Sequence, residues 1–160
     1  MPRIFLEITI HAEIQVVFDL SRSIDLHKIS TAQTKEEAIA GKTKGLLELG
    51  ESVTWRARHF GITQTLTSKL TEFNYPEYFV DEMITGAFTS FKHEHFFQKQ
   101  GGKVQMTDIF DYTSPLGLLG KLGDVLFLKK YMENLLVARN KVIKEFAETD
   151  KWKKVLLKRS

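Results

Sequence analysis

The sequence predicts an α+β protein in which a curved antiparallel sheet of six to seven strands wraps around a long C-terminal helix. Three observations support this class. Apolar residues alternate with polar ones from Leu46 to Thr113, the period of a half-buried strand. Short glycine-containing links such as Gly101-Gly102 separate these runs, which favours antiparallel neighbours. After Pro115 the spacing of apolar residues changes to three and four, which is typical of a helix.

The N-terminal part predicts one strand and two short helices. Pro2–Ile10 is the strand, and Glu13–Leu20 carries apolar residues at helical spacing. A second short helix is expected over Ser23–Ile29. Thr31–Lys44 is polar and rich in Lys and Glu, so we expect a long connection there.

The remaining strands follow one another with short turns between them. β-Branched and aromatic residues are frequent in these segments, as strands prefer. An open sheet of this length must bury one face, and the final helix is the expected cover. The predicted strands are Leu46–Leu49, Val53–Arg58, Thr63–Phe73, Glu77–Ile84, Phe88–Lys99 and Lys103–Thr113.

The C-terminal helix is expected to begin between Leu116 and Val125 and to continue past Arg139. Its apolar stripe extends to Phe146. With 160 residues the chain suits a single domain. We therefore expect one ligand-binding domain over residues 1–148 and a basic tail over 149–160.

Composition and charge exclude several classes. The chain has no cysteine, which excludes disulfides, thiolate metal ligands and a cysteine nucleophile. It has no uncharged apolar run of membrane-spanning length and no signal-like N-terminus, so a soluble, cytoplasmic protein is expected. The net charge is +3. Residues 151–160 carry five basic residues and no acidic one, so the rest of the chain sums to 3 − 5 = −2. The predictions are therefore no nucleic-acid partner and at most weak membrane-surface contact through the tail.

The hairpin around Gly101-Gly102 is the most informative segment. A two-residue loop places Gln100 opposite Lys103 and His95 opposite Asp108, whereas a four-residue loop places His93 opposite Asp108. Both loops keep the same residues on one face, because side chains alternate along a strand. That inward face carries Phe91, His93, His95, Phe97, Met106, Asp108, Phe110 and Tyr112.

His93, His95 and Asp108 are unusual on a face that is otherwise aromatic and apolar. Burying such groups without partners costs about 1–3 kcal/mol each, so we expect a His–Asp pair across the strands. Four roles stay open: a structural hydrogen-bond cluster, a group that orients the polar end of a ligand, an acid–base pair, and a metal site. No third histidine accompanies the pair, and we expect no metal and no cofactor.

Three more residues complete the candidate site. Trp55 alternates with arginines and is expected to point inward, either as core or against a ligand. Arg139 lies on the apolar stripe of the last helix. We expect it to extend to solvent, with a cavity carboxylate as the alternative partner. Tyr112 presents its phenol to the cavity or packs in the core. Common phosphate-loop, dinucleotide, GxSxG and HExxH signatures are absent.

Several short motifs together resemble one known superfamily. The matching pieces are Ala40-Gly41, Gly45-Leu46, Gly50–Ala57, His59-Phe60-Gly61, Phe91-x-His93-x-His95-x-Phe97 and Asp108-x-x-x-Tyr112-x-x-Pro115-x-Gly117. The chain is similar to the START-like, SRPBCC superfamily. More narrowly it resembles the bacterial branch of cell-division-inhibitor-like, ligand-binding SRPBCC proteins. Phe91 stands where the family form Trp-x-His-x-His has tryptophan.

The resemblance implies a helix-grip fold with an internal cavity, in a superfamily of lipid carriers, hormone and allergen-type binders and polyketide cyclases. The expected function is binding of a hydrophobic or amphipathic small molecule, with transport or sensing as its wider role. The alternative is a cyclase- or hydrolase-type enzyme that uses His93 or His95 with Asp108 as acid–base groups. A third possibility is an interaction module whose cavity is filled by side chains.

Overall fold

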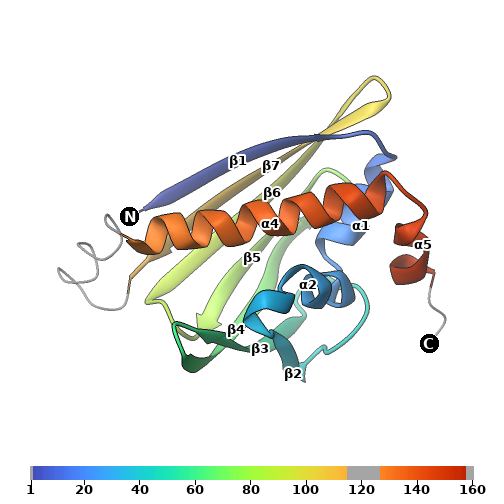
Figure 1. The fold of residues 1–160 in the computed structure, drawn as a ribbon. Coiled ribbons are helices and arrows are strands. Elements are labelled where there is room, and N and C mark those ends of the chain that lie inside the picture. Colours follow the sequence, from blue (N-terminus) through green and yellow to red (C-terminus); the bar gives the residue numbers. More distant parts are fainter. Residues whose placement is uncertain (1, 115–126, 158–160) are drawn as a thin grey trace.

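A computed structural model describes residues 2–114 and 127–157 and shows one antiparallel sheet of seven strands. The strand order is β1-β7-β6-β5-β4-β3-β2, so strands adjacent in sequence from β2 to β7 are also adjacent in space. The sheet curves around a long helix, as the ribbon in Figure 1 shows. The predicted fold class is therefore confirmed.

Most elements follow one another in the order that the sequence predicted, with small shifts at their ends. The strands are β1 (Arg3–Ile10), β2 (Glu37–Gly41), β3 (Ser52–His59), β4 (Ile62–Asn74), β5 (Tyr78–Thr85), β6 (Ser90–Gln100) and β7 (Lys103–Thr113). The helices are α1 (Ile14–Ser21), α2 (Ile24–Ser30), η1 (Ala32–Thr34, a 3-10 turn), α4 (Lys129–Ala147) and α5 (Lys151–Leu156).

Two neighbouring segments differ from the sequence prediction. The expected connection 31–44 contains η1 and the edge strand β2, which pairs with β3. The expected strand Leu46–Leu49 forms only an isolated bridge between Ser23 and Leu46. Its backbone is tied to the helical segment instead, since Leu47 N donates to Arg22 O over 3.2 Å. Non-local partners therefore override the local apolar pattern.

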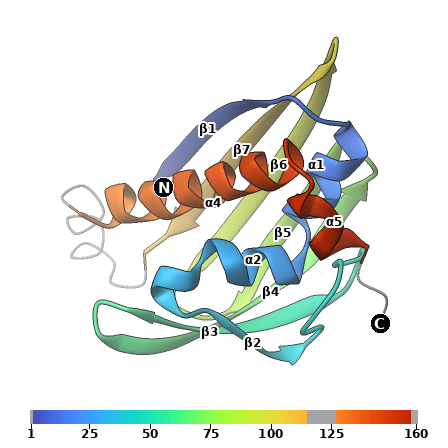
Figure 2. The same cartoon turned by 45° about the vertical axis from the view of Figure 1, so that its right-hand side comes forward.

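The helix α4 lies across the concave side of the sheet, as Figure 2 shows after a 45° turn. It is 19 residues long and extends past Arg139, as predicted. The predicted start between Leu116 and Val125 lies outside the described residues. The residues that α4 buries include Leu136, Arg139 and Ile143, which recur at three- and four-residue steps and so face the sheet.

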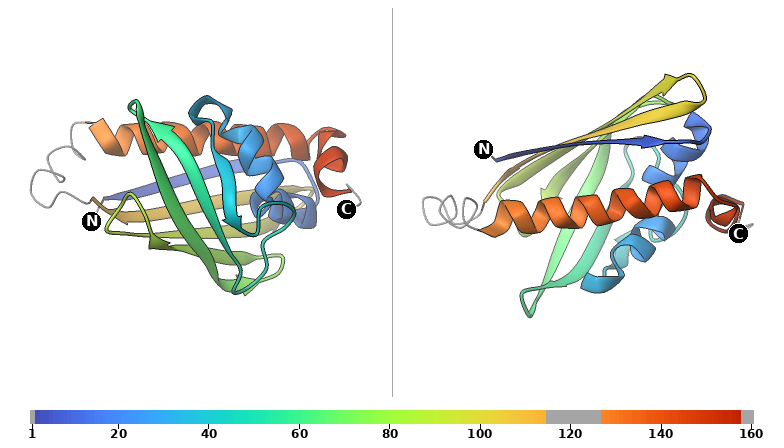
Figure 3. Two further views of the ribbon diagram at one scale, coloured as in Figure 1. Left: turned by 90° about the horizontal axis from the view of Figure 1, so that it is seen from below. Right: turned by 45° about the horizontal axis from the view of Figure 1, so that its top comes forward.

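Helices α1 and α5 pack near the C-terminal end of α4. Figure 3 shows this arrangement from two sides. One core cluster joins Phe18 of α1, Ile143 of α4 and Val155 of α5. A second cluster around Phe110 and Tyr112 packs near the start of α4. No helix within the described ranges is both long and apolar enough to cross a membrane.

The hairpin β6–β7 has the register of the two-residue loop. Gln100 pairs with Lys103 and His95 with Asp108, and Gly101 adopts a φ of +65° that glycine tolerates without strain. Buried residues alternate along both strands. The predicted inward face of this hairpin is thus confirmed.

Candidate functional site

A cavity of about 520 Å³ lies between the concave face of the sheet and α4. A volume of this size suits a small organic molecule. Most of its lining is apolar and comes from strands β3 to β7 and from α4. These apolar residues include Val53, Trp55, Ala57, Leu66, Leu70, Phe79, Phe88, Phe91, Phe110, Leu128, Met132, Leu135 and Leu136.

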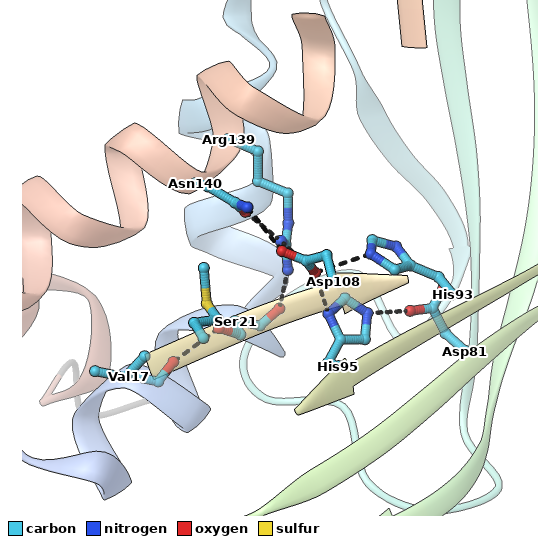
Figure 4. A network of polar contacts seen from close by, with 9 residues as sticks. Val17, Ser21, Asp81, His93, His95, Asp108, Arg139 and Asn140 are labelled. Atoms are coloured by element: carbon cyan, nitrogen blue, oxygen red, sulfur yellow. Dashed lines mark hydrogen bonds and ion pairs between the residues drawn. The ribbon is translucent and has the colours of Figure 1, made fainter. Parts of the chain in front are cut away.

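Six polar residues form a connected group on the inner wall, which we call the deep polar cluster. Strands β5, β6 and β7 and helix α4 contribute to it, as the close view in Figure 4 shows. Its members are Asp81, His93, His95, Asp108, Arg139 and Asn140.

Asp108 is the centre of this cluster. His93 Nε2 donates to Asp108 Oδ1 over 2.9 Å, and His95 Nδ1 lies 2.9 Å from the same oxygen. The second contact is a close electrostatic one, because its hydrogen-bond direction is unfavourable. Asn140 Nδ2 donates to Asp108 Oδ2 over 2.7 Å. One carboxylate thus holds both histidines and a helix side chain.

Asp81 supplies a second carboxylate from the neighbouring strand. Its Oδ2 lies 2.8 Å from His95 Nε2, although the backbone register places Asp81 directly opposite His93. Each histidine therefore bonds to the acid diagonally across from it. His95 lies between two carboxylates and is only 1% exposed.

Arg139 completes the balance of charge. Its Nη1 lies 3.6 Å from Asp108 Oδ1 and donates to Asn140 Oδ1 over 3.0 Å. Its Nη2 donates to the backbone oxygen of Ser21 over 3.0 Å. The expectation that Arg139 extends to solvent is wrong. Its guanidinium is buried and finds carboxylate and carbonyl partners in the protein, which offsets the cost of burial.

The two histidines of the cluster respond to burial differently. Burial and the neighbouring His95 charge lower the pKa of His93 despite its Asp108 bond. Burial alone would also lower the pKa of His95, but its contacts with Asp108 and Asp81 outweigh burial and raise it. His95 therefore holds a second proton to higher pH than His93 does.

The carboxyl groups of the cluster stay ionised. Burial would raise the pKa of Asp108, but the two histidine contacts and Arg139 hold it well below its ordinary value. Burial would likewise raise the pKa of Asp81, but the His95 hydrogen bond and the nearby histidine and Arg139 side chains outweigh burial and lower it. His95 and Arg139 are the side chains that can carry a positive charge beside these two anions.

A second polar group lines the opposite part of the cavity, and we call it the rim cluster. It consists of His27, Glu36, His59 and Tyr131. His27 Nε2 lies 2.6 Å from Glu36 Oε2, and the Tyr131 hydroxyl lies 2.7 Å from His59 Nδ1. The His27 ring also packs on Trp55, with centroids 4.3 Å apart.

Two exposed aromatic residues mark where the cavity meets solvent. Phe60, in the β3–β4 turn, is 54% exposed, and Phe127, just before α4, is 59% exposed. Their rings lie 5.3 Å apart, and both line the cavity. The opening is therefore apolar and lies beside the rim cluster.

The structure divides the predicted site residues into two groups. Trp55, Phe91, His93, His95, Phe110 and Arg139 line the cavity. The other four are buried behind this lining. Phe97 and Met106 pack in the core near α1, Tyr112 packs in the second cluster, and Asp108 lies beneath the histidines. These four support the cavity wall without forming its surface.

Several functional candidates were missed from sequence. Asp81 alternates with Phe79 and Met83, and Asn140 adjoins Arg139 on the buried stripe of α4. The spacing of apolar residues in β5 and α4 therefore indicated that both side chains point inward. The rim cluster had no comparable signal, since its members come from α2, the segment before β2, the end of β3 and α4.

The deep polar cluster offers hydrogen-bond donors, acceptors and titratable groups. It contains no serine, threonine or cysteine, so it provides no hydroxyl or thiol nucleophile. Its groups suit binding of a polar atom, proton transfer or coordination of a cation.

Comparisons with known proteins support the fold. No protein-family model and no curated protein sequence matches the chain. Solved structures do match. The TTHA0849 protein of Thermus thermophilus has a TM-score of 0.74 at 16% identity, covering 90% of this chain and 95% of that one. Major latex-like protein 151 of Panax ginseng has a TM-score of 0.67 at 13% identity, covering 92% and 98%. Protein Ms6760 of Mycobacterium smegmatis has a TM-score of 0.65 at 15% identity, covering 90% and 89%.

These similarities define the fold. The chain has a helix-grip fold, which it shares with the major latex-like structure. At such low identity the likeness shows the fold alone, and function must be argued from the site.

Proposed function

We propose that this protein binds a hydrophobic or amphipathic small molecule in the cavity between the sheet and α4. The observation that carries the proposal is a largely apolar cavity of about 520 Å³ with one polar cluster on its inner wall. Apolar lining supplies the affinity, and a few convergent polar groups fix the orientation. Transport or sensing of the bound molecule is the wider role that fits this chemistry.

The charge balance of the deep polar cluster narrows the ligand class. Asp81 and Asp108 are already matched by His95 and Arg139, so no buried cation is left for a ligand carboxylate. His93 lines the cavity with a neutral ring and suits a hydroxyl or carbonyl group. We therefore propose an apolar ligand with a neutral polar end.

The ligand proposal is tested with matched probes in a protein with one tryptophan. Trp55 and Trp152 are the only tryptophans, so the Trp152→Phe variant reports on the cavity through Trp55. Titration with decanol should change the Trp55 fluorescence until the site is saturated. Decanoate, which has the same chain length, should bind at least about tenfold more weakly, the equivalent of 1.4 kcal/mol. Equal affinity for both probes would contradict the assignment of a neutral polar end.

A steric variant and its control test the cavity itself. Ala57 lines the cavity, whereas the neighbouring Arg58 is exposed on the other face of β3. Ala57→Trp should abolish decanol binding, and Arg58→Trp should leave it unchanged. Both variants are made in the Trp152→Phe, Trp55→Phe background, with binding measured by calorimetry and folding by circular dichroism. If Ala57→Trp fails to fold, Ala57→Leu replaces it.

The enzymatic alternative has one specific observation in its favour. His93 is a neutral imidazole that faces an apolar cavity and is oriented by Asp108, the arrangement of a general base. A cyclase- or hydrolase-type reaction is therefore the second candidate. His93→Gln would then lower turnover by about a hundredfold or more while decanol affinity changes little.

The narrower bacterial branch and the cytoplasmic location are also proposals. The first is supported by the His93-x-His95 and Asp108-x-x-x-Tyr112 motifs, and the second by the absence of cysteine.

A further inference from the structure

We infer that His93, His95 and Asp81 form a binding site for a divalent transition-metal ion of the zinc or iron class on the inner wall of the cavity. The sequence prediction of no metal considered Asp108 as the carboxylate and found no third histidine. The structure supplies a different carboxylate, Asp81, from another strand. One ligand atom from each of the three residues lies within 4.8 Å of the others.

The arrangement of the two rings directs their free nitrogens to one side. His93 and His95 are two residues apart on β6, and their ring centroids are 3.8 Å apart. His93 Nε2 and His95 Nδ1 both contact Asp108 Oδ1. Of the other two nitrogens, His93 Nδ1 takes no part in the Asp108 contact, and His95 Nε2 lies 2.8 Å from Asp81 Oδ2. An ion would replace the proton held between His95 Nε2 and Asp81.

Asp81 lies on the side to which these nitrogens point. Its Oδ2 is 2.8 Å from His95 Nε2, and its backbone is directly opposite His93. Two imidazole nitrogens and one carboxylate oxygen are a donor set that zinc and non-haem iron accept. A bound ion would lie about 2.0–2.2 Å from each donor.

Asp108 has the position of an outer-shell group. Histidines that bind metals usually contact a carboxylate or carbonyl through the other ring nitrogen, which fixes the ring orientation. Here one carboxylate contacts both histidines and is itself held by Asn140 and Arg139. The outer shell is thus built into the fold before any ion binds.

The three ligand residues all line the cavity. Three protein ligands leave at least one coordination position open, and this position would face the apolar space. Within residues 2–114 and 127–157 no other set of histidine, aspartate and glutamate side chains meets the same geometry. His59 lines the same cavity outside this set and gives a matched control.

The test uses the full chain, freed of metal by a chelator, with Zn²⁺ or Co²⁺ alone as the probe and no organic ligand. Calorimetry should show one saturable Zn²⁺ site. Asp81→Asn and His95→Gln should each weaken it by about a hundredfold or more, beyond the roughly 10–100-fold typical of an outer-shell change. His59→Gln should leave the affinity unchanged. Co²⁺ should give the visible absorption of a low-coordinate histidine site.

Spectra of the unmodified protein keep the proposal testable if a variant does not fold. In ¹⁵N-histidine NMR, Zn²⁺ should shift His93 Nδ1 and His95 Nε2 and leave the His59 signals unchanged. The proposal is overturned by the absence of saturable binding, by full affinity in Asp81→Asn, or by shifts at His59 in place of the pair. Because no organic ligand is present, these outcomes are independent of the decanol experiments.

Discussion

The deep polar cluster and the rim cluster contain similar groups in different surroundings. Each pairs histidines with acids inside the same cavity. The deep cluster is buried on central strands, and every charge in it has a partner from β5, β7 or α4. The rim cluster lies beside the opening. Its Glu36 comes just before the short strand β2, and its Tyr131 lies in the first turn of α4.

The comparison shows that the neighbouring carboxylates, rather than burial alone, set the direction in which the pKa of each histidine shifts. His95 lies between two carboxylates, and its pKa is raised despite burial. His59 has only a more distant Glu36 as its anionic neighbour, and burial lowers its pKa. Glu36 itself keeps a lowered pKa because His27 outweighs its burial. We expect the deep cluster to hold structure and ligand position, and the rim cluster to respond to solvent.

The largest effect is expected from Asp108→Asn. This change removes a buried anion and leaves Arg139 and His95 without it, so the free energy of unfolding should fall by about 3–5 kcal/mol. Urea denaturation measures the loss. Glu36→Gln in the rim cluster is the control and should cost less than half as much. Similar losses in both variants would remove the proposed difference between the clusters.

A smaller loss is expected from Asn140→Ala. The amide donates to Asp108 Oδ2 in the buried interior, so its removal leaves an acceptor unpaired and should cost about 1–3 kcal/mol. Thermal unfolding monitored by circular dichroism is sufficient. Lys141→Ala, one position further on the exposed side of α4, should change the stability by less than about 0.5 kcal/mol. A loss in the control equal to that of Asn140→Ala would contradict the assignment.

The pH dependence of stability should differ in sign between the clusters. The pKa of His95 is raised above 6.5 in the folded protein, so its contribution is complete below pH 6.5 and is lost as pH rises through the folded pKa. The pKa of His59 is lowered below 6.5, so its contribution is present above pH 6.5 and is lost as pH falls through the folded pKa.

Unfolding measured at a series of pH values checks both signs. His95→Gln should flatten the alkaline decline, and His59→Gln should flatten part of the acidic decline. Two variants whose profiles parallel that of the unmodified protein would show that neither pKa shift is coupled to folding.

The smallest effect is expected at the rim. Tyr131→Phe removes the hydroxyl that lies 2.7 Å from His59 Nδ1, a partly exposed hydrogen bond worth about 0.5–1.5 kcal/mol. Urea denaturation should show this modest change, and the ¹⁵N signals of His59 should shift while those of His95 stay unchanged. A shift at His95 would mean that the two clusters are coupled across the cavity.

The parts that could be predicted from sequence are those with local regularity. The β6–β7 hairpin was predictable in register and face because Gly101-Gly102 fixes the turn and the side chains alternate. The same alternation in β5 would have placed Asp81 inward beside Phe79 and Met83. Its contact with His95 required the order of strands in the sheet, which the alternation alone does not define.

The parts that could not be predicted depend on distant partners. β2 is only five residues long and largely exposed, and it forms a strand because its backbone pairs with β3. Leu46–Leu49 has the apolar residues of a strand but is bound to the α1–α2 connection through Leu47 and Gly45. Glu36 of the rim cluster lies just before β2, so it was missed together with that strand.

The position of β1 has a kinetic consequence. β1 is an edge strand that pairs with β7, and the Arg3–Asp111 ion pair joins residues 108 positions apart in the chain. Strands β3 to β7 are joined to their neighbours by short turns, so their pairing closes small loops. The pairing of β1 with β7 closes a much longer loop, which costs more chain entropy. We expect strands β3 to β7 to form early in folding and β1 to pair with β7 late. Pulsed hydrogen exchange should then protect the amides of β6 before those of β1.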